Sequence, residues 1–156
     1  MTFQIRAAQQ EDLPEILEIN NHEILTSTIN YDFVPKTIQE QREWFEQKIS
    51  SGFPILVATL AGKVTGFATY GTFRPKPGYR FTVEHSVYIG SSFRGKGIGK
   101  LILTELIQIA KNSGYHTLVG GIDSSNEGSY LFHQKLGFKE VARFKEVGHK
   151  FGRWLD

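Results

Sequence analysis

Apolar and polar positions along the chain repeat with two periods, which predict the order of its secondary structure. Alternation is typical of a strand with one buried face, and an apolar residue every three or four positions is typical of a helix. Strands are therefore expected in residues 3–8, 53–60, 63–73, 80–89, 116–122 and 138–147, and helices in residues 11–25, 37–52, 99–114 and 125–137.

Residues at the ends of these segments support the boundaries. Asp12 is a candidate N-cap for the first helix, and Thr37 with Glu40 has the spacing of a capping box for the second. An Ala-Gly pair at 61–62 predicts a hairpin between the second and third strands. Strand–helix–strand crossovers in the second half imply parallel neighbours. The chain is therefore expected to form one α/β domain over residues 1–156, with a mixed sheet and helices on both faces.

Composition narrows the class of protein. The 156 residues carry a formal net charge of +2 and are 40% hydrophobic, which is typical of a globular domain and too weakly basic to indicate a nucleic-acid partner. There is no cysteine, which excludes disulfides, thiolate ligands and an acyl-cysteine intermediate. The histidines lack ligand spacing, so no metal is expected. Because no membrane span or secretion signal is apparent, a cytoplasmic protein without a membrane partner is expected.

The stretch YIGSSFRGKGIGKLIL at residues 88–103 places glycines and cations between a predicted strand and a long predicted helix. Glycine lets the backbone approach a phosphate, and the first N–H groups of the helix point toward it. A Walker A loop would need a hydroxyl at position 97, where this chain has glycine. A Rossmann fingerprint would need a different glycine spacing and a second βαβ half.

A third template, R-x-x-G-x-G, is met by Arg94, Gly97 and Gly99. It suits a diphosphate that is held and not cleaved, because no magnesium is then needed to neutralise a leaving group. A glycine-rich turn with solvated basic side chains explains the bare motif equally well, since short glycine patterns are weak indicators on their own.

The surrounding sequence favours the first interpretation. The motif, with EHSVYI before it and NEGSYLFHQKLGF after it, resembles the GNAT superfamily of acyl-CoA-dependent N-acyltransferases over essentially the whole chain. TVEHSVYI, LFHQKLGF and VGHKFGRWLD resemble the phosphinothricin and methionine sulfoximine acetyltransferase group within it. The resemblance implies a GNAT-type, mostly antiparallel central sheet, with acetyl-CoA as cosubstrate and no metal.

The resemblance also implies contacts to the cofactor. In that family the glycine motif binds the diphosphate of coenzyme A, and the strand before it presents backbone groups to the pantetheine arm. Asn126 would hydrogen-bond this arm, although capping of a helix is its alternative role and it could do both. The implied cofactor-binding residues are Val87, Tyr88, Ile89, Arg94, Gly95, Lys96, Gly97, Ile98, Gly99, Lys100, Asn126 and Ser129.

Acyl transfer to an amine needs a base for the amine and a proton for the leaving thiolate. Glu84 matches the glutamate of this group and is expected to act as the base through an ordered water, whereas the residues alone favour a solvent-facing carboxylate. His133 matches the group's histidine and is the candidate acid, since an imidazole with a pKa of about 6.5 gives up a proton readily. Packing beside the coenzyme without proton transfer explains His133 equally well.

The acceptor side is expected around the loop TFRPKPGYR at residues 72–80. Its cations suit a carboxylate, which favours an α-amino acid or analogue, although a solvated basic loop is the simpler explanation for Lys76. Phe33 and Tyr31 would line the side-chain pocket. The predicted acceptor contacts are Phe33, Arg74, Lys76, Arg80, Glu84 and His85.

The predicted function is direct transfer of an acetyl group from acetyl-CoA to the amino group of a small amino acid or analogue of the phosphinothricin, methionine sulfoximine or methionine sulfone type. Alternatives are a protein or peptide N-terminal acetyltransferase and a non-catalytic acyl-CoA-binding module; the presence of both Glu84 and His133 argues against the latter. The resemblance also implies a homodimer. Members of the group continue past GRWLD into a last strand, whereas this sequence stops at Asp156. Either the sequence is shortened or another element is expected to complete the sheet edge, and the stability of the fold and the closure of the acceptor site depend on which of the two holds.

Overall fold

A five-stranded sheet organises the chain in this computed structural model, which describes residues 2–156. The strands of the sheet are β1 (Gln4–Ala7), β2 (Ile55–Leu60), β3 (Lys63–Thr72), β4 (Thr82–Ile89) and β5 (Thr117–Gly120), and the helices are α1 (Leu13–Thr26), α2 (Ile38–Ser50), α3 (Ile98–Asn112) and α4 (Glu127–Lys135). The strands lie in sequence order. β1 to β4 are antiparallel neighbours, and β5 is parallel to β4. The predicted mixed, mostly antiparallel sheet is confirmed.

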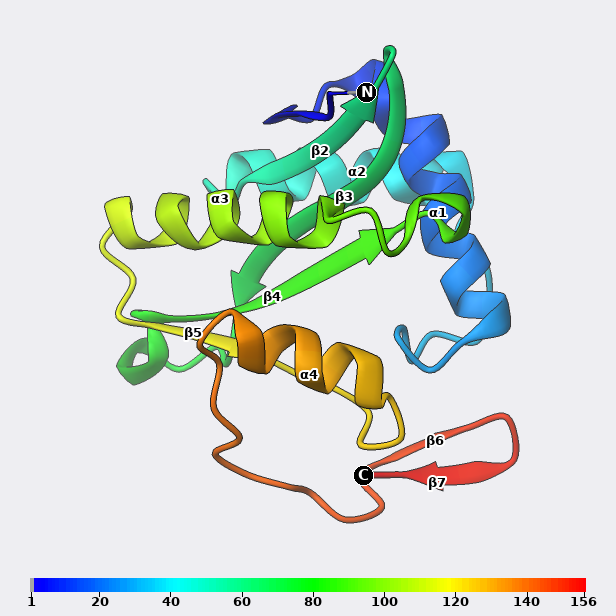
Figure 1. Cartoon of the computed structure of the whole chain (residues 1–156). Coiled ribbons are helices and arrows are strands. Elements are labelled where there is room, and N and C mark those ends of the chain that lie inside the picture. Colours follow the sequence, from blue (N-terminus) through cyan, green and yellow to red (C-terminus); the bar gives the residue numbers. More distant parts are fainter. Residues whose placement is uncertain (1) are drawn as a thin grey trace.

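Helices cover both faces of the sheet, as predicted, because alternate strand residues point to opposite sides. Leu56 and Tyr70 belong to a buried cluster with Ile102 of α3. Val57 belongs to a second cluster, with Leu13 of α1 and residues of α2. Figure 1 shows α3 and α4 in front of the sheet and α2 behind it. The two clusters hold one sheet between them, and this sheet positions the site.

The starts of the first two helices differ in how they are capped. The predicted capping box of α2 is confirmed: the Thr37 hydroxyl accepts from the Glu40 N–H, and the Glu40 carboxylate accepts from the Thr37 N–H. The Asp12 side chain does not cap α1. It instead binds the Arg6 guanidinium at 2.7 and 2.8 Å, which lowers the pKa of the Asp12 carboxyl. The Asp12 carboxylate thus binds the charged Arg6 guanidinium and does not bind the backbone N–H groups of α1.

The prediction of a strand over residues 138–147 is wrong. This segment is irregular, and a separate hairpin of β6 (Gly148–Lys150) and β7 (Arg153–Leu155) follows it. The apolar residues Phe138, Val141, Phe144 and Val147 recur at every third position. A strand gathers every second residue on one face, so this spacing cannot form a buried strand face. Val141, Phe144 and Val147 are accordingly exposed.

Candidate active site

β4 is paired along only half of one edge. β3 accompanies it as far as Ile89, whereas β5 accompanies it only as far as His85. Beyond that point, the β5-facing edge of β4 meets no further strand within residues 2–156. Backbone amides and carbonyls on such an edge can pair with an extended ligand. The predicted pantetheine contacts Val87, Tyr88 and Ile89 lie in this open segment.

Glu84 lies on β4 just before the two strands separate, and its side chain is exposed. Tyr88, four residues on, packs on the α1–α2 cluster, whereas Val83 and Val87 join the α3 cluster. Strand alternation therefore places Glu84 on the α1–α2 face. A Cβ added at Gly121 would stand only 3.0 Å from the Glu84 Oε1 atom. The glycine thus leaves space beside the carboxylate, where a ligand or a water molecule could approach.

α3 begins after a left-handed turn. Gly95 and Gly97 have φ of +74° and +81°, and no side-chain hydrogen bond caps the helix at Gly97. The first N–H groups of α3 therefore keep their hydrogen-bonding capacity at the positive end of the helix dipole. A Cβ at Gly99 would stand 3.2 Å from the Phe132 ring of α4. This glycine thus permits close packing of the two helices beside the open edge.

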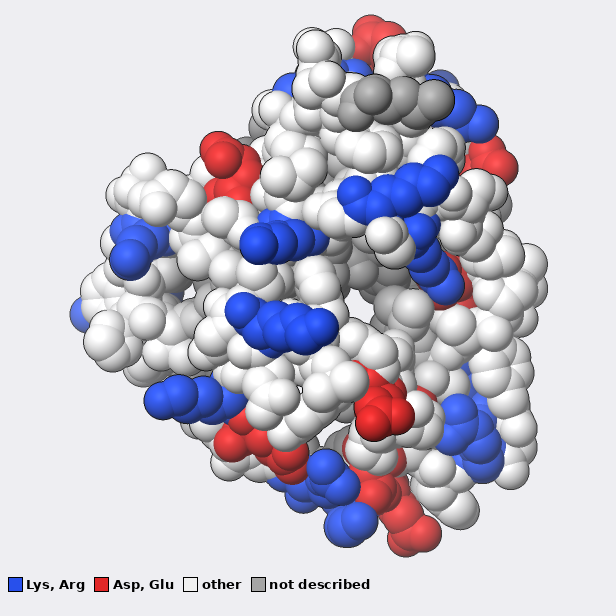
Figure 2. Space-filling model, in the orientation of Figure 1, with Lys and Arg blue, Asp and Glu red and all other residues white. Residues whose placement is uncertain are grey.

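Cations surround this helix start. Lys96 and Lys100 are exposed, and Ile98 is buried and anchors the first turn in the core. Figure 2 shows further Lys and Arg side chains on the face that α3 and α4 form. A helix N-terminus with adjacent positive charge favours an anion. The predicted diphosphate loop is therefore an exposed, positively charged turn next to the open edge of β4.

Arg94, the first residue of the predicted motif, pairs with an acidic side chain of α1. Its guanidinium forms an ion pair with the carboxylate of Glu23 in α1, and its Nε donates to the Ile89 carbonyl at 3.2 Å. The Glu23 side chain is only 2% exposed, so it needs this partner. Arg94 thus fixes the loop against α1 and the end of β4. The structure supports a bracing role for this side chain, and its predicted contact with the diphosphate stays a prediction.

His85 and His133 form a buried pair on the α3–α4 side of β4. Their Nε2 atoms lie 2.9 Å apart. Burial and the positive charge of His133 lower the pKa of His85 to about 4, and burial lowers the pKa of His133. The prediction that His85 contacts the acceptor is wrong. Its ring is only 6% exposed and lies on the opposite face of the sheet from Glu84. His133, on α4, lies on the opposite side of β4 from Glu84.

The start of α4 presents polar groups near the pair. The Asn126 side chain caps the helix by accepting from the Ser129 N–H at 3.0 Å. The Ser129 carbonyl and hydroxyl lie 2.7 and 3.3 Å from the His133 Nδ1 atom. The capping role considered for Asn126 is confirmed, and its contact with the pantetheine stays a prediction.

The predicted acceptor residues fall into two separate groups. Arg74, Lys76 and Arg80 lie on the exposed β3–β4 connection, where both guanidinium groups sit over aromatic rings of the same loop. Phe33 lies on the α1–α2 connector and is 66% exposed. Figure 1 shows these two connections at opposite ends of β4. The two groups therefore lie apart, Glu84 is closer in sequence to the cationic group, and the contacts of both groups with an acceptor stay predictions.

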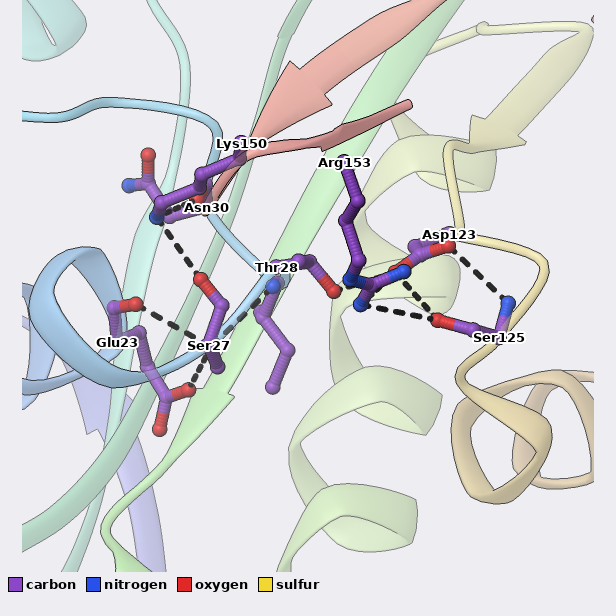
Figure 3. A network of polar contacts seen from close by, with 9 residues as sticks. Glu23, Ser27, Thr28, Asn30, Asp123, Ser125, Lys150 and Arg153 are labelled. Carbon is purple, nitrogen blue, oxygen red and sulfur yellow. Dashed lines mark hydrogen bonds and ion pairs between the residues drawn. The ribbon is translucent and has the colours of Figure 1, made fainter. Parts of the chain in front are cut away.

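A buried lysine at the end of the chain holds the α1–α2 connector (Figure 3). The Lys150 ammonium donates to the carbonyls of Ser27 and Asn30 at 2.8 and 2.5 Å. Lys150 is 2% exposed, and burial lowers the pKa of its ammonium. The sequence alone missed this residue, because nothing local in VGHKFGRWLD distinguishes a buried lysine from a surface one.

The same connector is tied to the loop after β5 by Asp123 (Figure 3). Its carboxylate accepts from the hydroxyls of Thr28 and Ser125 and lies 3.7 Å from the Arg153 guanidinium. Burial opposes the charge on Asp123, but these three partners and the Ser125 N–H together lower the pKa of the carboxyl. The open end of β4 is thus flanked by a connector that is anchored to both β5 and the β6–β7 hairpin.

Other features do not mark a competing site. A pocket of about 170 Å³ lies between α1 and the segment 90–93, and Glu84 and His133 are not among its lining residues. Residues 2–156 contain no group of three His, Cys, Asp or Glu side chains arranged to hold a metal ion. None of the helices formed by these residues is long and apolar enough to cross a membrane.

Known proteins share both this fold and these sequence features. The L-methionine sulfoximine/L-methionine sulfone acetyltransferase of Pseudomonas paraeruginosa is 43% identical over 157 aligned residues, which cover 100% of this chain and 91% of the relative. The phosphinothricin N-acetyltransferase of Alcaligenes faecalis is 37% identical, with 97% of this chain and 78% of the relative covered.

Solved structures of acetyltransferases have the same fold as this chain. A GNAT superfamily phosphinothricin acetyltransferase from Sinorhizobium meliloti, in complex with acetyl-CoA, has a TM-score of 0.95 and 35% identity over 99% of this chain and 84% of its own. The ribosomal-protein-alanine N-acetyltransferase from Brucella melitensis has a TM-score of 0.96 and 41% identity over 97% of this chain and 94% of its own. A family model of the acetyltransferase (GNAT) domain matches residues 5–156. The chain therefore belongs to the GNAT acetyltransferase family.

Proposed function

We propose that this chain transfers the acetyl group of acetyl-CoA to the amino group of a small amino acid or analogue, by direct transfer while both substrates are bound. The observation that carries the proposal is the open edge of β4, which has the uncapped start of α3 at one end and Glu84 at the other. This arrangement offers separate partners to the diphosphate and to the reactive thioester of an extended cofactor.

The diphosphate is assigned to the backbone N–H groups after Gly97, helped by Lys96 and Lys100, because helix N-termini and nearby cations favour anions. The pantetheine arm is assigned to the backbone of Val87–Ile89. One N–H group there would polarise the thioester carbonyl and stabilise negative charge on its oxygen as the amine attacks. The diphosphate is held and not cleaved, so no metal is required at this loop.

Glu84 is assigned as the base. A free α-amine has a pKa of about 7.7–8.0, so part of it must lose a proton before it attacks the thioester. The exposed carboxylate of Glu84, with space beside Gly121, can accept that proton through a water molecule. The C–N bond then forms, the C–S bond breaks, and the thiolate takes up a proton that charged His133 supplies.

The acceptor class is proposed from the relatives and from charge. Two relatives are named for amino acid analogues, methionine sulfoximine or sulfone and phosphinothricin. Arg74 and Arg80, on the connection that leads into β4, suit the carboxylate of such a substrate. A peptide N-terminus is the second candidate, because the Brucella neighbour is named for a ribosomal protein.

An acceptor panel separates these candidates. Coenzyme A release would be measured with methionine sulfone, methionine sulfoximine, phosphinothricin, ordinary amino acids and a peptide that begins with alanine. We expect saturable turnover with at least one free amino acid or analogue and little with the peptide. Peptide turnover alone would overturn the small-acceptor assignment, and no turnover with any amine would overturn the enzymatic function.

We also propose that the chain forms a homodimer and that residues 1–156 act as one domain. The exposed apolar side chains of Val141, Phe144 and Val147 support a contact surface. The single sheet shared by both hydrophobic clusters supports one domain. Light scattering during gel filtration tests the first point, and a single cooperative unfolding transition tests the second. Location in the cytoplasm stays a prediction from the sequence.

A further inference from the structure

The buried contact between His85 and His133 fixes where protons sit on both rings. Each ring offers two nitrogens, and in a neutral imidazole one of them is a donor and the other an acceptor. All four nitrogens of the pair lie within hydrogen-bond distance of a partner. The chemical nature of those partners therefore limits the arrangements of protons that the pair can adopt.

The first constraint comes from β5. The Nδ1 atom of His85 lies 3.0 Å from the carbonyl of Val119, and a carbonyl can only accept. His85 must therefore carry its proton on Nδ1, and its Nε2 atom is an acceptor when the ring is neutral. The Nε2 atom of His133 lies 2.9 Å from that acceptor. His133 must supply the proton of this contact, because two unprotonated nitrogens at this distance would repel each other.

The second constraint comes from Ser129, which presents two different groups to the Nδ1 atom of His133. Its hydroxyl, at 3.3 Å, can donate to an unprotonated nitrogen, and its carbonyl, at 2.7 Å, can accept from a protonated one. Charged His133 therefore satisfies both the carbonyl and His85. A neutral ring with its proton on Nε2 faces the carbonyl with an unprotonated Nδ1, and the Ser129 hydroxyl is the donor that compensates, whereas the Nε2 contact with His85 has no such alternative donor. In both states the proton on Nε2 is needed by His85, and only the proton on Nδ1 is exchanged.

We propose that His85 is a positioning residue that holds a proton on Nε2 of His133, so that His133 gains and releases its exchangeable proton at Nδ1, beside the hydroxyl of Ser129. On the proposed function, this defines the route to the leaving thiolate. The Ser129 hydroxyl gives its proton to the sulfur and takes the Nδ1 proton of charged His133. The thiol is formed, the hydroxyl is restored, and neutral His133 remains with its proton on Nε2.

The surroundings of the pair support this division of roles. The rings of Phe132 and Phe138 pack on it with centroid distances between 5.1 and 5.3 Å. Val119 on β5 offers only its carbonyl, and Glu84, the ionisable neighbour on β4, points to the other face. Burial lowers the pKa of His133, which makes its charged form a stronger acid than a free imidazolium.

Nitrogen-15 NMR of the full chain, labelled at histidine, tests the proposal directly. Long-range proton–nitrogen correlations at pH 7.5 distinguish the Nδ1–H from the Nε2–H form of each ring. In the wild type we expect the Nδ1–H form for His85 and the Nε2–H form for His133. The exposed His22, His116 and His149 serve as internal references.

Two substitutions of His85 make the test specific. His85→Leu removes the acceptor, so the proton of His133 should move to Nδ1, where the Ser129 carbonyl accepts it. His85→Gln restores an acceptor oxygen near the position of the imidazole Nε2, so the Nε2–H form should return. The pH dependence of kcat should shift in His85→Leu and stay near that of the wild type in His85→Gln, which a purely structural role would not produce.

The proposal is overturned if His133 carries its proton on Nδ1 in the wild type, or if His85→Leu leaves its form unchanged. Should His85→Leu fail to fold, the wild-type and His85→Gln spectra still decide. The measurement uses the resting protein without coenzyme A or amine. A chain with the expected proton positions and no acetyl transfer would therefore contradict the proposed function and leave this inference standing.

Discussion

Glu84 and His85 are neighbours on β4, but their side chains lie on opposite faces of the sheet. Glu84 is exposed on the side of α1 and α2, and His85 is buried against His133 of α4. The strand edge between these two faces is where β5 separates from β4. In the proposed mechanism, a proton would therefore leave the amine on the Glu84 face and reach the sulfur from the His133 face.

Replacement of Glu84 by Gln should slow the reaction without unfolding the protein. Loss of a general base typically lowers kcat by about 10²–10⁴-fold, and the exposed side chain contributes little packing. Steady-state kinetics and thermal unfolding measure the two effects. Glu105→Gln, at an exposed position of α3, is the matched control and should change neither. Full activity of Glu84→Gln would remove Glu84 from the mechanism.

Gly97→Ala should weaken acetyl-CoA binding by disturbing the left-handed turn before α3. Its φ is +81°, and an added Cβ meets no atom within 4 Å, so the direct cost is backbone strain of about 1–2 kcal/mol. Gly114 at the other end of α3 has φ +83° and equally open space. Gly114→Ala should therefore cost similar stability and leave the calorimetric Kd for acetyl-CoA unchanged. Equal Kd values in both variants would argue against the diphosphate loop.

Arg94→Gln should destabilise the fold because it leaves the buried carboxylate of Glu23 without its charged partner and with only the Ser27 hydroxyl as a side-chain donor. Breaking a buried ion pair costs roughly 3 kcal/mol of unfolding free energy. Because Arg94 is half exposed, the loss in Arg94→Gln should not exceed this value. Urea unfolding of Arg94→Gln, Glu23→Gln and the double variant measures the coupling. Arg143→Gln breaks an exposed ion pair with Glu140 and should cost less than about 1 kcal/mol. Additive losses in the Arg94 cycle would mean that the pair is not coupled.

The histidine pair should make stability fall as the pH drops from about 6.5 toward 4. Burial lowers the pKa of both rings in the folded state, that of His85 to about 4, so the folded chain binds fewer protons than the unfolded chain in this range. The stabilisation is complete above the unfolded pKa and is lost through this window. The loss should approach roughly 3 kcal/mol. Urea midpoints between pH 7.5 and 4 measure it.

The variant His85→Gln cannot take up a proton at position 85, so it should show a shallower fall than the wild type. The buried carboxylates with lowered pKa, Asp12 and Asp123, and the more exposed ones, Glu40 and Asp156, lose their contribution to stability mainly at more acidic pH. Identical slopes in both proteins would show that His85 does not titrate with unfolding.

Local patterns predicted the fold well where one physical signal dominated. The Ala61–Gly62 turn has positive φ at both residues and joins β2 to β3 as expected. The capping box at Thr37 was also readable, because both partners lie within one turn. The segment 138–147 was misjudged because its composition suits a strand, although its apolar spacing does not. A segment buries one face as a strand only when its composition suits a strand and its apolar residues alternate with polar ones.

The site was predictable as a set of residues and less so as a set of contacts. The glycines that lead into α3 could be located because their spacing is local. The pairing of Arg94 with Glu23, and of His85 with His133, joins residues 71 and 48 positions apart, which no local pattern encodes. Lys150 was missed for the same reason. The burial that gives these side chains their roles comes from tertiary packing.

The most direct test of the proposed function follows the acetyl group itself. Acetyl-CoA labelled with carbon-13 in its acetyl group would be incubated with the full chain and methionine sulfone, and the products analysed by mass spectrometry and by thiol release. We predict N-acetylated amino acid that carries the label, formed in equal amount to free coenzyme A and formed much more slowly by Glu84→Gln. Thiol release that does not depend on the amine, or the absence of labelled product with every amino acid and analogue tested, would contradict the account.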